Sequence, residues 1–189
     1  MTAPPVVRTS QPPRWGLAAV GAVGIIVSAI LAAYARVSPG DGAAITTLGF
    51  STLLAMKSWL CTAVIALVVV QVLSALAMWG RLPGVSSAPS WVSPLHRWSG
   101  TVAFLISVLV AFHCVWSLGF DDSSARTLIH SLAGCLVYGV FAAKMLSLRL
   151  PGLPGWTLPV LGGALAVVLT VVWFTSALWF FTVSGIPAY

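Results

Sequence analysis

The sequence predicts an all-α membrane protein, a polytopic bundle of five transmembrane helices. Of its 189 residues, 59% are hydrophobic and only 6% are charged, whereas a soluble domain carries roughly 25% charged residues. Five apolar segments are each long enough to cross a bilayer, which takes about 20 residues in a helix. Backbone groups that face lipid must be hydrogen-bonded internally. The apolar segments are therefore expected to be helices and not isolated strands.

The expected helices follow one another with short connections, at about 15–35, 58–80, 94–120, 123–148 and 156–182. Residues 1–14 (MTAPPVVRTSQPPR) are proline-rich and polar, a composition typical of a disordered tail. No internal repeat and no second domain is evident. The chain is therefore divided into a disordered cytoplasmic tail, 1–14, and a single transmembrane domain, 15–189.

Two of the helix starts carry capping signals. Ser93 followed by Pro94 predicts an N-cap with proline at the first helical position. Asp121, Asp122 and Ser123 are predicted to cap the fourth helix, because negative charge is favourable at a helix N-terminus.

The basic residues predict the orientation of the bundle. With the N-terminus inside, six cations fall on the cytoplasmic side, namely Arg8, Arg14, Arg81, Arg97, Lys144 and Arg149. Three fall on the outer side, namely Arg36, Lys57 and Arg126. The positive-inside rule then favours an N-inside, C-outside protein, expected as a multi-pass protein of the plasma membrane. No soluble element carries a basic face, so the net charge of +6 does not indicate nucleic-acid binding. The absence of acidic residues within the apolar segments argues against a proton- or cation-coupled transporter.

His113 and His130 are the strongest candidates for a cofactor site. They occur on consecutive apolar segments, on either side of the polar turn GFDDSSAR. Both are expected roughly 10 Å below the outer ends of their helices. An imidazole inside a membrane is costly unless it is paired or ligated, and a depth-matched pair can hold the iron of haem b from two sides. Gly134, one turn from His130, would let a flat macrocycle approach the backbone.

Other interpretations of the histidines remain open. Each histidine alone could instead form an interhelical hydrogen bond. The pair could also bind another metal or act as a proton relay. A copper site that includes Cys61, Cys114 and Cys135 is a further alternative. His96 precedes His113 by seventeen residues, which is roughly 25 Å along a helix. His96 is therefore expected at the inner surface, either as an interfacial residue near a quinone headgroup or as a further cofactor ligand.

The stretch LHRWSGTVAFLISVLVAFHC resembles the opening of a helix in the ferric reductase-like transmembrane family. The residues that carry the resemblance are His96, Arg97, Trp98 and Gly100, with His113 as the second histidine. The resemblance implies a b-type cytochrome in which histidines of this helix bind haem. The chain is also similar to a group of small five-helix membrane proteins that share HRWSG and the later block HSLAGCLVYGVFAAK.

These observations lead to two hypotheses of function. In the first, the chain is a small membrane b-type cytochrome that passes electrons between quinol and a redox partner at the outer face, with one haem b held by His113 and His130. In the second, the chain is a cofactor-free accessory or assembly subunit of a larger respiratory complex. Both hypotheses predict contact with the lipid bilayer and with other membrane redox subunits, and neither assigns a catalytic residue.

Overall fold

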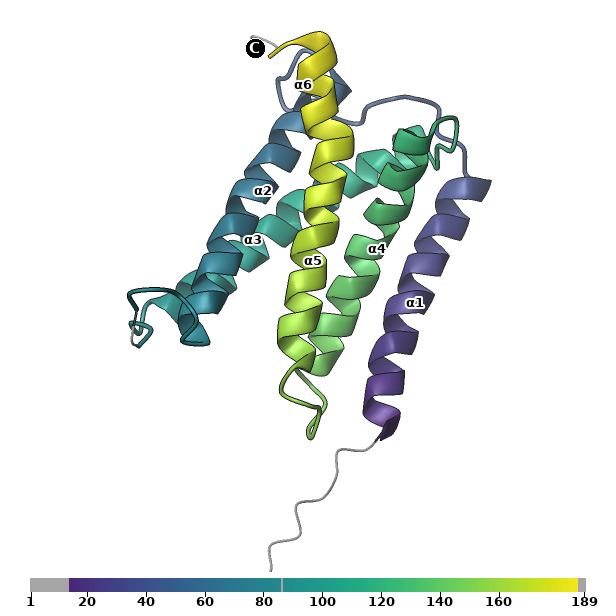
Figure 1. The fold of residues 1–189 in the computed structure, drawn as a ribbon. Helices are drawn as coiled ribbons and strands as arrows, with labels where there is room; N and C mark the ends of the chain where they lie inside the picture. Colours follow the sequence, from purple (N-terminus) through teal and green to yellow (C-terminus); the bar gives the residue numbers. More distant parts are fainter. Residues whose placement is uncertain (1–13, 86, 187–189) are drawn as a thin grey trace, which may run out of the picture.

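The computed structural model describes residues 14–85 and 87–186, and every described regular element is a helix (Figure 1). The elements in order are α1 (Arg14–Val37), α2 (Leu53–Met78), α3 (Val92–Phe112), η1 (His113–Leu118), α4 (Ala125–Ser147), α5 (Thr157–Trp173), η2 (Phe174–Leu178) and α6 (Trp179–Ser184). The segments η1 and η2 are π-helical turns that continue α3 and α5. A π-turn is wider than an α-turn and occurs frequently at functional sites.

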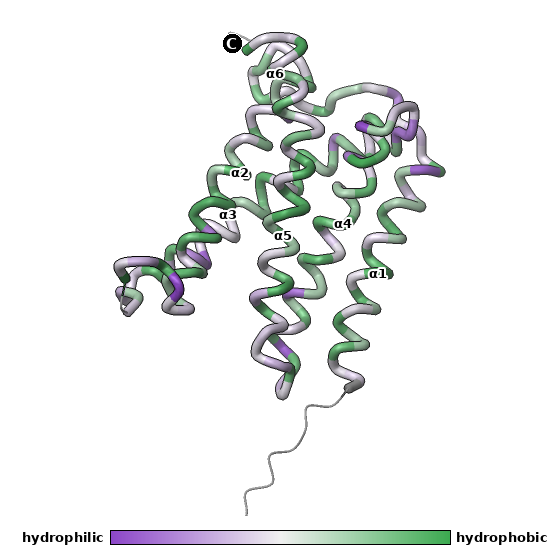
Figure 2. The backbone as a smooth tube through the Cα atoms, viewed as in Figure 1, coloured by the Kyte–Doolittle hydropathy of each residue, from purple (hydrophilic) through white to green (hydrophobic). Residues whose placement is uncertain are grey.

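The helices form five spans that are long and apolar enough to cross a membrane, which confirms the predicted fold class. Hydrophobic residues cover the middle of every span, and hydrophilic residues gather at the two ends of the bundle (Figure 2). Large apolar side chains such as Ile25, Leu105 and Val167 are more than half exposed. In water such a surface would drive aggregation, so its natural environment is lipid. The protein is therefore a multi-pass membrane protein.

The two ends of the bundle are named here after the predicted orientation. The predicted inner end contains the start of α1, the α2–α3 and α4–α5 connections, and Arg81, Arg97, Lys144 and Arg149. The predicted outer end contains η1, η2, the α1–α2 and α3–α4 connections, and Arg36, Lys57 and Arg126.

Several predicted boundaries need correction. The second helix begins at Leu53 rather than at 58, and Arg14 already belongs to α1; the rest of the predicted tail lies outside the described residues. The third helix starts at Val92, and its N-cap residue Trp91 makes no side-chain capping bond, so the predicted Ser93 cap is wrong.

The predicted cap of the fourth helix is also wrong. Ser124 is the N-cap of α4, and it forms a reciprocal capping box with Thr127. The two aspartates are engaged elsewhere. Asp122 forms an ion pair with Arg36 at 2.7 Å, and Asp121 accepts a 2.8 Å hydrogen bond from the Ser123 backbone. Hydrogen bonds from Ser123 lower the pKa of the Asp121 carboxyl below its ordinary value.

Helices α1 and α4 approach each other closely, and glycines permit this approach. A Cβ atom on Gly139 would clash with the Gly24 carbonyl and the Ser28 hydroxyl, and one on Gly24 would lie 3.2 Å from the Gly139 carbonyl. Membrane helices gain little from burying apolar surface against each other, because lipid is equally apolar. Close backbone contact between small residues therefore supplies much of the attraction between α1 and α4.

We expect Gly139→Ala to destabilise the bundle by about 1–3 kcal/mol, since the added methyl forces α1 and α4 apart. The measurement is thermal unfolding in detergent, followed by circular dichroism. Gly162→Ala is the matched control, because nothing lies within 4 Å of a Cβ built at that position of α5. Equal melting temperatures for Gly139→Ala and the wild type would contradict this packing argument.

Candidate functional site

Two of the three histidines lie toward the same end of the bundle. His113 is the first residue of η1, and His130 lies in the second turn of α4. Each is roughly one and a half turns from the predicted outer end of its helix, so the depths match as the sequence predicts. His96 lies at the start of α3, at the predicted inner end.

The imidazole of His113 is buried and only half satisfied. The residue is 1% exposed, and its Nδ1–H donates a 2.9 Å hydrogen bond to the Leu109 carbonyl, one turn earlier. A carbonyl oxygen can only accept, so the proton of the neutral ring is on Nδ1 and Nε2 carries a lone pair. That Nε2 atom is buried without a hydrogen-bond partner in the described structure, and so is the hydroxyl of Ser117 one turn later. Leaving such a group unpaired costs roughly 1–3 kcal/mol.

His130 joins α4 to the π-turn η2. Its Nδ1 lies 3.1 Å from the Thr175 hydroxyl. That hydroxyl already donates to the Val171 carbonyl at 2.8 Å, so it has no second proton and must accept from His130. Nε2 of His130 therefore also carries a lone pair. Thr175 thus joins η2 to α4 by an interhelical hydrogen bond.

Arg126, one turn before His130, strengthens the same junction. Its guanidinium donates a 2.7 Å hydrogen bond to the Thr175 backbone carbonyl. It also lies 3.7 Å above the ring of Trp179, a distance suited to a cation–π contact. The backbone carbonyl and the side-chain hydroxyl of Thr175 thus both bond to residues of α4. These two bonds fix the position of η2 relative to His130.

At the predicted inner end, His96 belongs to a polar layer between α2 and α3. Its Nδ1–H donates to the Ser74 hydroxyl at 2.8 Å, since that hydroxyl donates to the Val70 carbonyl. Gln71 donates to the His96 carbonyl and, at 2.6 Å, to Ser99. Gln71 thereby joins α2 to α3 by interhelical hydrogen bonds.

The layer between α2 and α3 explains the HRWSG block in structural terms. A Cβ atom on Gly100 would lie 3.0 Å from the Gln71 side chain. His96, Ser99 and Gly100 therefore share the face of α3 that packs against α2. Ser74 was not predicted from the sequence, although its spacing of three residues from Gln71 indicates a shared polar face.

A buried lysine lies among the neighbours of the outer pair. Lys57 is at the predicted outer end, as expected from the sequence, and it is only 8% exposed. The Cys114 thiol lies within interaction range of the Lys57 ammonium and the His130 imidazole. All three cysteines are free, and no group of three or more His, Cys, Asp or Glu residues with metal-site geometry occurs in the described part of the chain.

The space beside His130 agrees with the reason for choosing Gly134. Nothing lies within 4 Å of a Cβ built on Gly134. The helices α3 and α4 meet there mainly through long side chains, with Phe104 stacked on Phe141 at 4.2 Å and the Tyr138 hydroxyl donating to the Ser107 carbonyl at 2.7 Å. The hairpin formed by α3 and α4 is therefore splayed, as a ligand between its helices would require.

The fold and the histidines define a class: a five-span membrane protein with a buried, unpaired imidazole nitrogen near one membrane surface. By sequence the chain belongs to a family of unknown function, DUF6529, whose model matches residues 16–188. No curated protein matches the chain. No solved structure matches it either.

We expect Thr175→Val to lower stability by about 1 kcal/mol, because the half-buried His130 Nδ1–H loses its acceptor. Thr170→Val is the matched control, since the Thr170 hydroxyl bonds only the Ala166 carbonyl of its own helix. Thermal unfolding in detergent measures the difference.

¹⁵N NMR of the wild-type histidines, free of cofactor, is expected to report the Nδ1–H tautomer at His113 and His130. Finding the Nε2–H tautomer at either residue would refute the assignment.

Proposed function

We propose that this protein is a membrane electron-transfer subunit that binds one haem b through Nε2 of His113 and Nε2 of His130. The observation that carries the proposal is the buried Nε2 of His113, which has no hydrogen-bond partner among the described residues. An apolar residue would fill the same volume at lower cost. A ligand that accepts this lone pair gives the histidine a reason to be there.

The donor chemistry of both residues fits a haem iron. Histidines that bind metals usually coordinate through one ring nitrogen and donate the other N–H to a protein acceptor, which fixes ring orientation and tautomer. The Leu109 carbonyl fills this supporting role for His113, and the Thr175 hydroxyl fills it for His130. The bare side of Gly134 supplies room for a flat macrocycle. When bound, haem b supplies a one-electron ferric/ferrous couple.

Binding at this position requires a local opening of the bundle. Nε2 of His113 is covered by protein atoms, so an iron can reach it only if the segment that covers it moves. The π-turn η1 begins at His113 and packs against α1 and the α1–α2 connection, where the Gly42 amide donates to the Ser117 carbonyl at 2.8 Å. The segment that has to move is therefore η1 together with this connection.

The depth of the two histidines defines the partners of the proposed subunit. A single haem near one surface cannot carry electrons across about 30 Å of hydrocarbon. The electron donor must therefore reach the haem within the bilayer, as a quinol does, and the acceptor is a redox partner at the outer face. The distribution of basic residues between the two ends supports an N-inside orientation in the plasma membrane.

We expect the full chain, purified in mild detergent after expression with a haem precursor, to give b-type bands in reduced-minus-oxidised spectra. Pyridine haemochrome analysis should return one haem per chain. His113→Ala and His130→Ala should each lose the bands, because one axial ligand is gone. His113→Met should retain haem with a shifted spectrum, since a thioether replaces an imidazole.

His96→Ala is the matched control for these variants, because it removes an imidazole of the same tautomer at the opposite end of the bundle. It should keep the bands of the wild type. Wild-type protein without b-type bands, or bands that persist in both His113→Ala and His130→Ala, would rule the proposal out.

A second candidate function is a cofactor-free accessory subunit of a larger membrane complex. The observation that favours it is that His96 and His130 each join two helices by a hydrogen bond, as polar residues commonly do inside membranes. This alternative predicts no bound haem and co-purification with a larger membrane assembly.

A further inference from the structure

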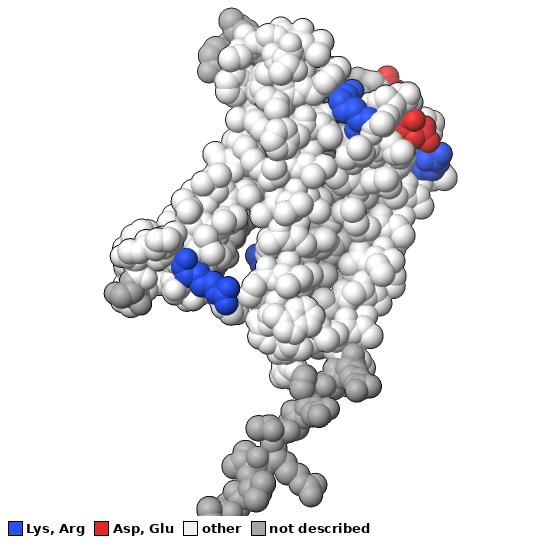
Figure 3. Space-filling model, in the orientation of Figure 1, with Lys and Arg blue, Asp and Glu red and all other residues white. Residues whose placement is uncertain are grey.

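A cleft opens between two pairs of helices toward the predicted inner end. The α2–α3 and α4–α5 pairs meet near the predicted outer end, where the Trp173 indole donates to the Thr62 hydroxyl at 3.0 Å and Trp59 lies 5.3 Å from Phe181. From there the two pairs diverge (Figure 1). The space-filling view shows the resulting opening, with basic atoms visible inside it (Figure 3).

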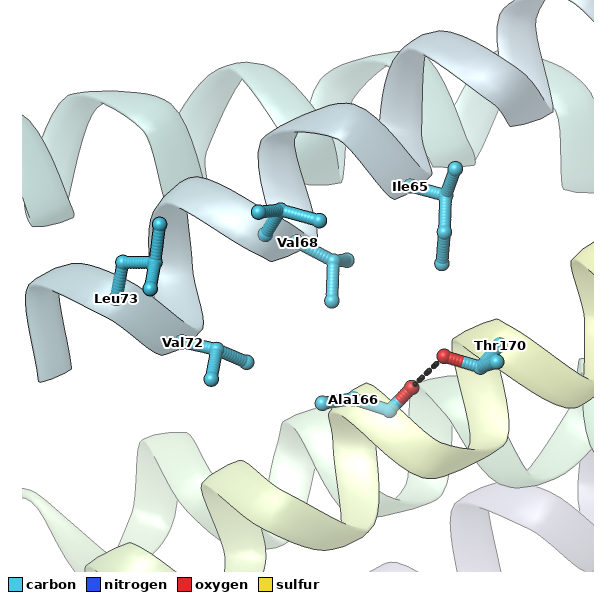
Figure 4. Close-up of a pocket in the computed structure, with 7 residues that line it drawn as sticks. Ile65, Val68, Val72, Leu73, Ala166 and Thr170 are labelled. Carbon is cyan, nitrogen blue, oxygen red and sulfur yellow. Dashed lines mark hydrogen bonds between the residues drawn. The ribbon is translucent and has the colours of Figure 1, made fainter. Parts of the chain in front are cut away.

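The upper part of this cleft is an apolar groove of about 230 Å³ between α2 and α5, lined by Ile65, Val68, Val69, Val72, Leu73, Ala166 and Thr170. Side chains of α2 point across it toward Ala166 and Thr170 of α5 (Figure 4). The single hydroxyl in the lining, that of Thr170, is bonded to the Ala166 carbonyl at 2.8 Å. The groove therefore offers an occupant only apolar surface, as a hydrocarbon chain prefers.

The lower part of the cleft contains a positive charge without a counter-ion. Lys144 lies one turn before the end of α4 and is only partly exposed. It is within electrostatic range of His96 on α3, across the opening. The side-chain ammonium of Lys144 forms no hydrogen bond and no ion pair within residues 14–85 and 87–186. The acidic residues Asp41, Asp121 and Asp122 all belong to the opposite end.

Other charges near Lys144 have the same sign. Arg97 follows His96 on α3, and Arg81 follows α2; both are exposed at the predicted inner end. A partly buried ammonium in a low-dielectric surrounding is stabilised by an anion. This end of the described chain provides none, so an anion from outside the protein would stabilise the ammonium.

We propose that the cleft binds one anionic phospholipid, with its phosphate at Lys144 and an acyl chain in the groove between α2 and α5. The arrangement of the parts matches such a molecule. Lys144 is about one turn from the inner helix ends, and Ala166 is about two and a half turns from the start of α5. The polar site is thus at headgroup depth, and the apolar groove continues toward the membrane centre. Basic pockets between membrane helices recognise anionic headgroups in this way.

The proposal does not depend on haem binding, and it distinguishes an anionic lipid from a quinone. A quinone headgroup is neutral and would leave the Lys144 charge uncompensated. A phosphate compensates it through a charge-assisted hydrogen bond. The lipid would also fill the space between the two helix pairs and hold them at a fixed separation.

Native mass spectrometry of the full chain, titrated with phosphatidylglycerol or with phosphatidylcholine of identical acyl chains, tests this proposal. We expect one phosphatidylglycerol per chain, bound at least about tenfold more tightly than phosphatidylcholine, since each tenfold step corresponds to about 1.4 kcal/mol. Lys144→Gln should remove the preference, and Lys144→Arg should keep it. Arg149→Gln is the matched control, because it removes an exposed charge just beyond the same helix end and should leave the preference unchanged.

A second variant tests the chain-binding groove independently of Lys144. Ala166→Phe fills the groove and should weaken phosphatidylglycerol binding while the fold is retained in circular dichroism. Glycerol phosphate alone should compete poorly, because it lacks the acyl chain. Equal binding of the two lipids, an unchanged preference in Lys144→Gln, or displacement of phosphatidylglycerol by an equimolar short-chain ubiquinone would overturn the proposal.

Discussion

Hydrogen bonds between helices are the interactions on which the rest of this bundle depends, because lipid is as apolar as the side chains it surrounds. Three contacts carry most of this function. Gln71 joins α2 to α3, Thr175 joins η2 to α4, and Tyr138 joins α4 to α3. Without its contact, each of these polar groups would lie in hydrocarbon without a hydrogen-bond partner. The close packing of α1 on α4 through Gly24 and Gly139 completes the assembly.

The two π-turns follow from the same constraint. A π-turn changes the direction of the side chains that follow it and alters which carbonyls are bonded within the helix. In η2 the Thr175 carbonyl accepts from Arg126 and the Thr175 hydroxyl accepts from His130. In η1 the Ser117 carbonyl accepts from the Gly42 amide. The irregular turns therefore join separate segments at the predicted outer end. At the predicted inner end the polar layer joins α2 to α3, and the α2–α3 and α4–α5 pairs diverge (Figure 1).

The sequence was sufficient to predict the five spans, because apolar length is a local property that needs no knowledge of neighbours. The helix caps were less predictable, since four candidates are adjacent in Asp121-Asp122-Ser123-Ser124. The choice of Ser124 depends on Thr127, which returns a bond to it, and on Arg36 from a distant helix, which engages Asp122. The start of α2 was missed because Lys57 interrupts the apolar run, although the fold buries that lysine.

The candidate site was predictable only in part for a related reason. Spacing along two helices gave the matched depth of His113 and His130, and it also indicated the open side of Gly134. Which ring nitrogen of His130 carries the proton depends on whether the Thr175 hydroxyl donates or accepts. That in turn depends on the bond from this hydroxyl to the Val171 carbonyl, within another helix. The burial of His113 depends on η1 and the α1–α2 connection, and neither was evident from periodicity.

The different situations of the three histidines bear on the two candidate functions. A scaffold needs polar groups that join helices, and His96 and His130 meet that need through Nδ1. His113 does not, because its Nδ1–H donates to the Leu109 carbonyl of its own helix and its Nε2 has no partner in the part of the chain that the structure describes. A scaffold would be more stable with leucine or methionine at this position, since neither carries an unpaired nitrogen. The hypothesis of interhelical hydrogen bonding thus accounts for two histidines and leaves the most buried one unexplained. Coordination of a haem iron would use the lone pair of His113. It would also keep the hydrogen bond from His130 to Thr175, which would hold the second ligand in place. We therefore favour the electron-transfer function.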